Sequence, residues 1–172
     1  MTTTARTAAV IAGLGAVFWA VSQATARTQR LSRDEVYRLA QSVIEEHRLA
    51  VDPCMVTAIA KIESGYNPMA IRWEGHIGDA SSGLMQTLLG TAYWLATDMS
   101  YGAHGTPALN DLFDPRVSIY FGAAYLHWLR TYRGLPRTEQ WIVQSYNGGP
   151  GNFSGATERY WSRYVAAKQE VC

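Results

Sequence analysis

The feature that most constrains the fold is a series of helix-start signals, each followed by apolar residues at helical spacing. Ser32 and Glu35 form an S-x-x-E capping box, and the apolar residues after them recur with the period of an α-helix. The dipeptide Asp-Pro occurs at 52–53 and again at 114–115, where it places an N-cap residue before a proline at the first helical position. No alternating run of useful strand length occurs. The sequence therefore predicts a mostly α-helical protein.

The same signals divide the chain into elements. We expect helices that begin at Ser32, Asp52, Leu84, Asp114, Thr138 and Thr157, the third ending near Asp98 and the fourth near Tyr132. Residues 69–83 are rich in turn formers, which predicts a loop with room for a small β-hairpin. Residues 100–113 contain Gly and Pro and predict a long connection. Since no internal repeat occurs, we expect one domain.

Composition limits the classes of protein and partner. With 172 residues, 48% of them hydrophobic and 17% charged, the chain can bury one globular core. The formal net charge is only +1 and no nucleic-acid-binding motif occurs, so DNA and RNA partners are not expected. The four histidines, at positions 47, 76, 104 and 127, are scattered, and neither cysteine has a ligand neighbour. We therefore expect no metal site and no cofactor.

Residues 1–26 have the pattern of an export signal or an uncleaved membrane anchor. They contain no acidic residue, and Arg6 precedes the apolar run "TAAVIAGLGAVFWAV", which ends near the cleavage-like sequence Ala24-Thr25-Ala26. The run is short for a membrane span and is interrupted by two glycines. An organelle transit peptide or a disordered tail is the alternative. We expect residues 27–172 to form the domain, in an extracytoplasmic location.

The two cysteines, Cys54 and Cys172, are too few for a disulfide framework. In an exported chain they could form one bridge that ties the C-terminus to a helix start. The alternative is a buried thiol and a free terminal thiol, and the sequence leaves both open.

The segment "ESGYNP", residues 63–68, places the ionisable Glu63 on the apolar stripe of a helix that stops at once at Gly65 and Pro68. A carboxyl on a core-facing stripe is partly desolvated, which disfavours its charged form and raises its pKa. A Glu that keeps its proton near neutral pH can act as the general acid in glycoside cleavage. The alternative is a surface Glu that merely ends a helix.

Two further segments, "SSGLMQTLLGTA" at 81–92 and "SYNGGPGN" at 145–152, carry amide, hydroxyl or aromatic groups near turns. The amides of Gln86 and Asn147 can hydrogen-bond to sugar hydroxyls or N-acetyl groups, and Tyr146 can stack on a sugar ring or donate to it. Taken singly, each segment fits equally well as a tight turn with a packed side chain.

Four segments occur in one order: "IESGYNP", then "GLMQ" followed by "GTA", then "DP" with "SIYFGAAYLHWL", then "SYNGGPG". In this order they resemble the catalytic domain of soluble lytic transglycosylases, in the lysozyme-like superfamily. The resemblance covers about residues 32–165. It implies a single mostly α lysozyme-like domain with a cleft for peptidoglycan glycan strands, and we expect a monomer.

The resemblance also implies roles for individual residues. Glu63 would first protonate the bond between N-acetylmuramic acid (MurNAc) and N-acetylglucosamine (GlcNAc). The same carboxyl would then take the proton of the muramic O6 hydroxyl, which closes a 1,6-anhydro ring without water. Met85 and Gln86 would line the floor of the cleft, with Tyr146 and Asn147 opposite.

The sequence departs from the family pattern between the first two motifs. A serine usually stands nine residues after the glutamate, and that position is Arg72 here; Ser81 or Ser82 is a candidate for replacing its hydroxyl. The segment is also longer and brings Glu74 and Asp79. Goose-type lysozymes carry a similar "GD" before "GLMQ", and there an aspartate helps to position a water. Asp79 is therefore a possible second carboxylate, and turn capping is its alternative role.

These departures leave two alternatives to a transglycosylase. If Asp79 faces Glu63 with space for a water, the enzyme is a goose-type-like muramidase that hydrolyses the bond. If Arg72 lies beside Glu63 and lowers its pKa, the domain is an inactive module that binds glycan or serves as a scaffold.

Overall fold

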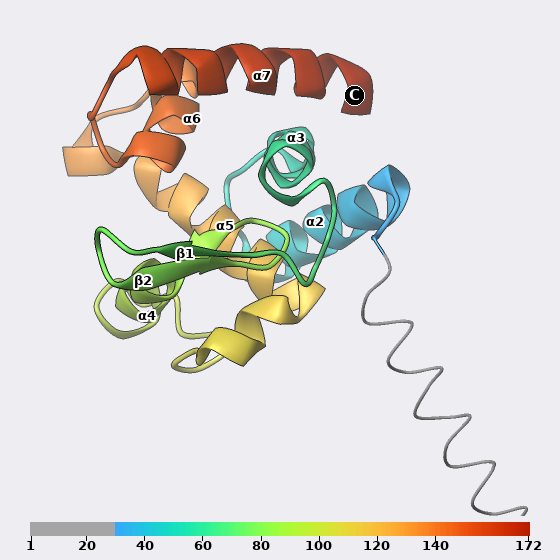
Figure 1. Ribbon diagram of the computed structural model, residues 1–172, viewed down its shortest axis with the longest axis vertical. Coiled ribbons are helices and arrows are strands. Elements are labelled where there is room, and N and C mark those ends of the chain that lie inside the picture. Colours follow the sequence, from blue (N-terminus) through green and yellow to red (C-terminus); the bar gives the residue numbers. More distant parts are fainter. Residues whose placement is uncertain (1–29) are drawn as a thin grey trace, which may run out of the picture.

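The computed structural model describes residues 30–172, and α-helices carry most of that part of the chain (Figure 1). The helices are α2 (Arg33–His47), α3 (Pro53–Ser64), α4 (Leu89–Thr97), α5 (Pro115–Leu129), α6 (Glu139–Gly148) and α7 (Gly155–Val171). Two 3-10 helices, η1 (Leu109–Phe113) and η2 (Tyr132–Gly134), flank α5. The strands are β1 (Ile71–Glu74), β2 (Asp79–Ser82) and β3 (Thr87–Leu88). The predicted mostly α fold is confirmed.

Local capping explains where the helices begin. The Ser32 hydroxyl accepts from the Glu35 backbone N–H while the Glu35 carboxylate accepts from that of Ser32, which completes the predicted capping box. The Asp52 carboxylate accepts from the Cys54 N–H at 2.9 Å, with a proline at the first helical position. Asp114 caps α5 in the same way. These three predicted starts are confirmed.

Two helix starts and one end differ from prediction. The helix expected from Leu84 begins only at Leu89, because Gly83 and Gln86 have φ values of 74° and 47°, which an α-helix cannot contain. The last helix begins at Gly155, two residues earlier than expected, because Ser154 is its N-cap. Helix α5 ends at Leu129 rather than near Tyr132.

The lengthened segment forms the predicted small hairpin. Strands β1 and β2 pair antiparallel, with Ile71 opposite Ser82 and Glu74 opposite Asp79, and the short β3 adds a third strand beside β2. Gly78, in the turn between β1 and β2, has a φ of 66°, a conformation that glycine adopts without a steric penalty.

The core lies around α5, which runs through the middle of the domain in Figure 1. Its side chains Ile119, Phe121 and Leu126 are fully buried. Helix α7 runs along one end of the domain, next to α3 and α6, while the sheet and α4 lie towards the other end. This arrangement places the end of α3 between α7 and the hairpin.

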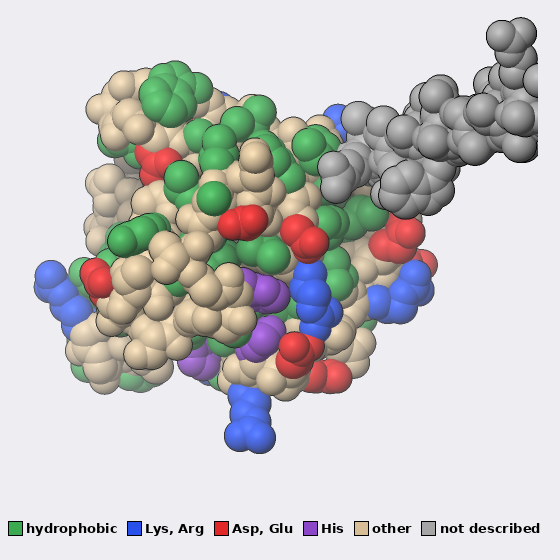
Figure 2. Space-filling model, turned by 90° about the horizontal axis from the view of Figure 1, so that it is seen from below, with side chains coloured by type: hydrophobic (Ala, Val, Ile, Leu, Met, Phe, Trp, Pro, Cys, Tyr) green, Lys and Arg blue, Asp and Glu red, His purple; other side chains and the backbone are tan. Residues whose placement is uncertain are grey.

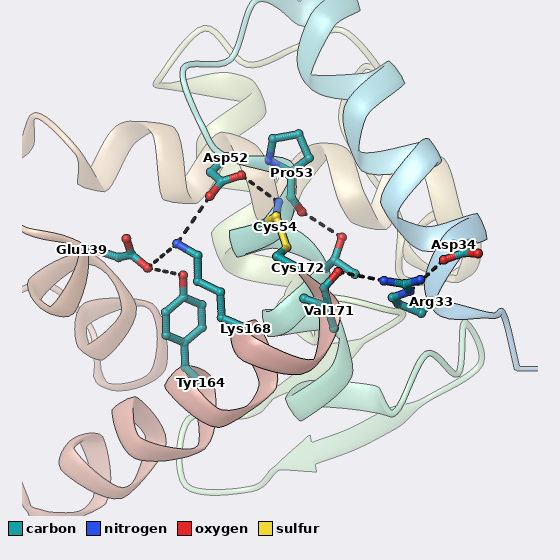
Figure 3. Close-up of a disulfide and its surroundings, with 11 residues drawn as sticks. Arg33, Asp34, Asp52, Pro53, Cys54, Glu139, Tyr164, Lys168, Val171 and Cys172 are labelled. Carbon is teal, nitrogen blue, oxygen red and sulfur yellow. Dashed lines mark hydrogen bonds and ion pairs between the residues drawn. A yellow bond between two sulfur atoms is a disulfide. The ribbon is translucent and has the colours of Figure 1, made fainter.

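A disulfide joins Cys54, in the first turn of α3, to Cys172 after α7, with a Cα–Cα distance of 6.1 Å (Figure 3). Beside it, the Lys168 ammonium lies 2.7 Å from Glu139 and 3.4 Å from Asp52. The bridged alternative for the two cysteines is therefore the observed one. The bridge and the Lys168–Asp52 pair hold α7 against α3, which carries Glu63, and the Lys168–Glu139 pair holds α7 against α6.

Acidic and basic side chains are interspersed on the face drawn in Figure 2, in keeping with the balanced sequence charge. None of the helices within residues 30–172 is both long enough and apolar enough to span a bilayer. The predicted signal or anchor at 1–26 lies outside the described residues.

Candidate active site

A cavity of about 380 Å³ opens where α3, the hairpin, α5 and α6 meet. This volume is within the range of roughly 300–1,000 Å³ that is usual for small-ligand sites. Polar and aromatic side chains from all four regions line it, among them Glu63, Arg72, Glu74, Tyr125, Tyr146 and Asn147. Segments far apart in the sequence therefore contribute to one site.

Glu63 reaches this cavity because of how α3 ends. The apolar stripe of the helix is fully buried at Val56, Ile59 and Ala60, which fixes the helix against the core. Gly65 then takes a left-handed conformation with φ 58°, and its N–H bonds to the Lys61 carbonyl. Glu63 is left half-buried in the last turn, at the cavity wall.

Burial raises the pKa of the Glu63 carboxyl. Desolvation of the charged form is the largest cause, and the nearby charge of Glu74 acts in the same direction. A hydrogen bond from Tyr160 and the charges of Arg72 and Arg163 lower the pKa, but they do not cancel the effect of burial. A protonated Glu63 can therefore donate a proton within the cavity.

The Tyr160 hydroxyl, from α7, donates to Oε1 of Glu63 at 2.6 Å. Tyr160 is only 4% exposed, so its ring is fixed by the core and its hydroxyl fixes one carboxyl oxygen of Glu63. Burial raises the pKa of Tyr160 well above its usual range, and this hydroxyl stays a donor.

Tyr146 and Asn147 lie at the end of α6 and line the same cavity as Glu63. The Tyr146 hydroxyl donates to the Met85 carbonyl at 2.8 Å, which ties α6 to the turn after the hairpin. Burial first, and the Glu63 charge second, raise the pKa of Tyr146. Asn147 is exposed, so its amide can reach a ligand.

Gln86 also lines the cavity, from a backbone turn with φ 47°. Its amide nitrogen donates to the carbonyls of Ala70 and Gly83, each at 3.0 Å. The side chain thus holds the chain that follows α3 against the turn after β2.

Met85 and Ser82 lie beneath the cavity wall rather than on it. Both side chains are fully buried, and neither is among the residues that line the cavity. Met85 packs on Gly122 of α5, where an added Cβ would lie 2.7 Å from the Met85 side chain. The expectation that Met85 lines the floor is corrected, because its side chain points into the core and only its carbonyl serves the site, through Tyr146.

The Asp79 carboxylate bonds to backbone N–H groups and does not line the cavity. Its Oδ2 accepts from the Gly90 N–H at 2.9 Å and its Oδ1 from the Ala80 N–H at 2.7 Å, so it ties β2 to the first turn of α4. It is not among the residues that line the cavity. The capping interpretation of Asp79 describes this geometry, and the placement opposite Glu63 does not.

Arg72, Glu74 and Ser81 line the cavity from the hairpin. Oε1 of Glu74 accepts from Arg72 Nε at 2.6 Å and from the Ser81 hydroxyl at 3.1 Å. The hydrogen bond from Arg72 is the main reason why the pKa of Glu74 is lowered. Of the two serines considered as replacements for the missing hydroxyl, Ser81 is the one at the cavity.

Residues 41–166 match the family model described as the transglycosylase SLT domain. The chain belongs to this family. Over 110 residues it is 36% identical to the membrane-bound lytic murein transglycosylase C of Edwardsiella ictaluri (strain 93-146), a match that covers 61% of this chain and 29% of that protein. The matched segment therefore spans less than a third of that relative's length.

Solved structures agree on the fold. A complex of the 70-kDa soluble lytic transglycosylase with bulgecin A matches 78% of this chain and 20% of that one, with a TM-score of 0.54 and 23% identity. An inactive mutant of the lytic transglycosylase Slt from Pseudomonas aeruginosa matches 78% of this chain and 22% of that one, with a TM-score of 0.53 and 21% identity. The lysozyme-like fold of the SLT domain is confirmed.

Sequence reasoning missed Tyr160 and undervalued Glu74. Tyr160 lies 97 residues from Glu63 and sits on an amphipathic helix, where its spacing looks like that of any core residue. Glu74 was visible as an added carboxylate in the lengthened segment, but its direction depends on the hairpin register. Within residues 30–172, no three His, Cys, Asp or Glu side chains are grouped as metal ligands would be.

Proposed function

We propose that this SLT domain is a peptidoglycan lytic transglycosylase that cleaves the β-1,4 bond between MurNAc and GlcNAc. The observation that carries the proposal is the half-buried Glu63, whose pKa is raised, at the wall of a polar and aromatic cavity. Membership of the SLT family and the name of the Edwardsiella ictaluri relative support it.

In the first step, Glu63 donates its proton to the glycosidic oxygen as that oxygen leaves C1 of MurNAc. This donation is needed because an unprotonated sugar oxygen is a poor leaving group. The Tyr160 hydroxyl holds Oε1, which orients the carboxyl for transfer. Tyr146 and Asn147 bind the sugar at the same cavity wall.

In the second step, the Glu63 carboxylate takes the proton of the muramic O6 hydroxyl while O6 bonds to C1. The product is a 1,6-anhydroMurNAc end, and Glu63 recovers its proton. One carboxyl serves both steps, so the reaction needs no carboxylate that activates water. This agrees with Asp79 being occupied by two backbone N–H groups.

The location and partners follow from the same proposal. The substrate is the glycan strand of peptidoglycan, outside the cytoplasm, and the predicted export signal or anchor at 1–26 would deliver the domain there, with membrane association if the segment is retained. The Cys54–Cys172 disulfide supports this location, because such bonds persist in oxidising compartments. We propose that the domain acts as a monomer.

The test is digestion of purified sacculi, followed by mass spectrometry of the products. The proposal predicts 1,6-anhydro-muropeptides from the wild type and their loss in Glu63→Gln. Products with only reducing muramic ends would instead identify a hydrolase. Sacculus binding without any product would identify an inactive binding module.

A further inference from the structure

The hairpin presents ionisable side chains to the cavity that the proposed reaction does not use. Successive side chains of a strand point to opposite faces, and Arg72 and Glu74 of β1 both line the cavity, as does His76 in the turn that follows. Trp73, between the first two, is 68% exposed. The lengthened segment therefore adds a charged wall to the same cavity that Glu63 lines.

Glu74 is the fixed member of this wall. Its Oε1 accepts from Arg72 Nε at 2.6 Å and from the hydroxyl of Ser81, which is the cross-strand partner of Arg72. Among the described residues no side chain or backbone group donates to Oε2, so this oxygen is left for a ligand. Bonds that favour the ionised form make a carboxylate a poor proton acceptor. Glu74 is thus suited to remain an anion and unsuited to activating water as a base.

Arg72 and Glu74 form an ion pair, and the charge of Arg72 affects the pKa of Glu63 more strongly than the charge of Glu74 does. The Arg72 side chain is 65% exposed, whereas that of Glu74 is 17% exposed. The carboxylate is therefore the more enclosed member of this pair. Glu63 and Glu74 have their pKa values moved in opposite directions, upward for Glu63 and downward for Glu74. A protonated acid and a lasting anion in one cavity are the usual arrangement for glycoside cleavage.

We propose that the Glu74 carboxylate stabilises the positive charge that develops on the MurNAc ring as its glycosidic bond breaks. This inference rests on the proposed function, since it adds a residue to the same reaction. The Glu63 proton goes to the leaving oxygen, which also keeps the electron pair of the broken bond. C1 and the ring oxygen then share positive charge until O6 attacks C1 and returns its proton to Glu63. Glu74 forms no bond and ends unchanged.

The test compares Glu74→Gln with Arg72→Gln in the full chain, on soluble muropeptide oligomers over a range of pH. Glu74→Gln keeps an oxygen acceptor for Arg72 and Ser81 but removes the charge. For Glu74→Gln we expect kcat to fall at least about ten-fold with little change in KM, because the lost interaction forms in the transition state. Glu45→Gln, on the exposed face of α2, is the matched control and should keep wild-type rates.

The pH profile separates this role from a structural one. Without the Glu74 anion the pKa of Glu63 falls, so the alkaline limb of the rate moves to lower pH. Without Arg72 the pKa of Glu63 rises, and the limb moves to higher pH. The other titratable or charged groups around the cavity are the same in both variants: His76 of the hairpin, Tyr125 of α5, Tyr146 of α6, and Tyr160 and Arg163 of α7.

The inference is supported if kcat falls in Glu74→Gln and the alkaline limb moves to lower pH in Glu74→Gln and to higher pH in Arg72→Gln. A wild-type kcat in Glu74→Gln overturns it, and so does a loss that only follows a lower melting temperature. If the wild type releases anhydro products and Glu74→Gln is unimpaired, the proposed function stands and this inference falls. If the wild type releases reducing ends, the proposed function falls, but a kcat loss still supports the inference because both reactions share bond cleavage.

Discussion

The hydroxyl of Tyr160 donates a 2.6 Å hydrogen bond to Oε1 of Glu63, joining helices α7 and α3 across 97 residues of sequence. This contact has two opposed effects on the site. It fixes the orientation of the carboxyl, which favours proton transfer to a bound sugar. It also favours the ionised carboxylate, which partly offsets the effect of burial on the pKa of Glu63.

Tyr160→Phe should therefore separate the effect of Tyr160 on the orientation of the Glu63 carboxyl from its effect on the pKa of Glu63. Without the hydroxyl the pKa of Glu63 rises further, so the alkaline limb of the rate should move to higher pH, while kcat falls roughly ten-fold because the carboxyl is less well oriented. The pH dependence of kcat/KM measures both effects. Tyr164→Phe, in the same helix but bonded to Glu139, is the control and should leave the limb in place. A limb that moves to lower pH in Tyr160→Phe would contradict this account.

At a pH above its pKa, the ionised Glu63 carboxylate should destabilise the folded state. Because burial raises the pKa of Glu63, the folded state binds this proton more tightly than the unfolded chain does. Its contribution is therefore most favourable below the unfolded pKa of about 4.3 and is lost as pH rises through the folded pKa. Glu63→Gln removes this loss. Its melting temperature should exceed that of the wild type at about pH 8, and the difference should shrink towards about pH 4. An equal difference at both pH values would count against a raised pKa.

Local signals made the helix starts predictable. The capping box at Ser32 and the Asp-Pro pair at 52–53 each act within four residues, so the sequence alone specifies them. The helix expected from Leu84 was wrong in its first turn for the opposite reason. There the Gly83 N–H donates to the Ala70 carbonyl and the Met85 N–H donates to the Ser118 hydroxyl, and these bonds hold a turn. The spacing of apolar residues does not reveal such distant partners.

The candidate site was predictable only in part for the same reason. Glu63 could be found from the end of its own helix, and Tyr146 and Asn147 from the resemblance. Met85 was misplaced because a family motif identifies a residue without indicating which face its side chain takes. Tyr160 depends on how α7 packs on α3, and no local pattern encodes that contact.

The disulfide should stabilise the fold without taking part in the chemistry. It joins residues 118 apart in the sequence, and closing a loop of that size restricts the unfolded chain strongly. Replacing both cysteines with serine should lower the free energy of unfolding by about 2–5 kcal/mol, measured by urea denaturation. Activity per folded molecule should persist, since the bridge lies at the opposite end of α3 from Glu63. Reduction of the wild type should reproduce the loss of stability, and a stable double variant would contradict it.

Gly83 should tolerate no side chain. A Cβ there would lie 1.9 Å from the Leu112 carbonyl oxygen, and the residue has a φ of 74°. Gly83→Ala should cost about 3 kcal/mol or more in unfolding free energy and reduce activity, because the turn that presents Gln86 would shift. Gly78→Ala is the matched control, with a φ of 66° and no atom within 4 Å of the added Cβ. It should cost only about 1–2 kcal/mol, the backbone penalty alone. If both variants lost the same unfolding free energy, the structure around Gly83 would have to move to accommodate the added Cβ, which would contradict this prediction.

Replacing Asp79 should lower the stability of the fold without changing the products of the reaction. Asp79→Ala removes the acceptor for the Gly90 N–H at the start of α4, so unfolding free energy should fall by about 1 kcal/mol. Asp79→Asn keeps an acceptor oxygen and should recover most of that stability. Neither variant should change the ratio of anhydro to reducing ends, which mass spectrometry of sacculus digests measures. If Asp79 instead positions a water opposite Glu63, Asp79→Asn would remove reducing-end products while the protein stays folded. Because the carboxylate is bound by two backbone N–H groups away from the cavity, we expect the ratio to stay unchanged.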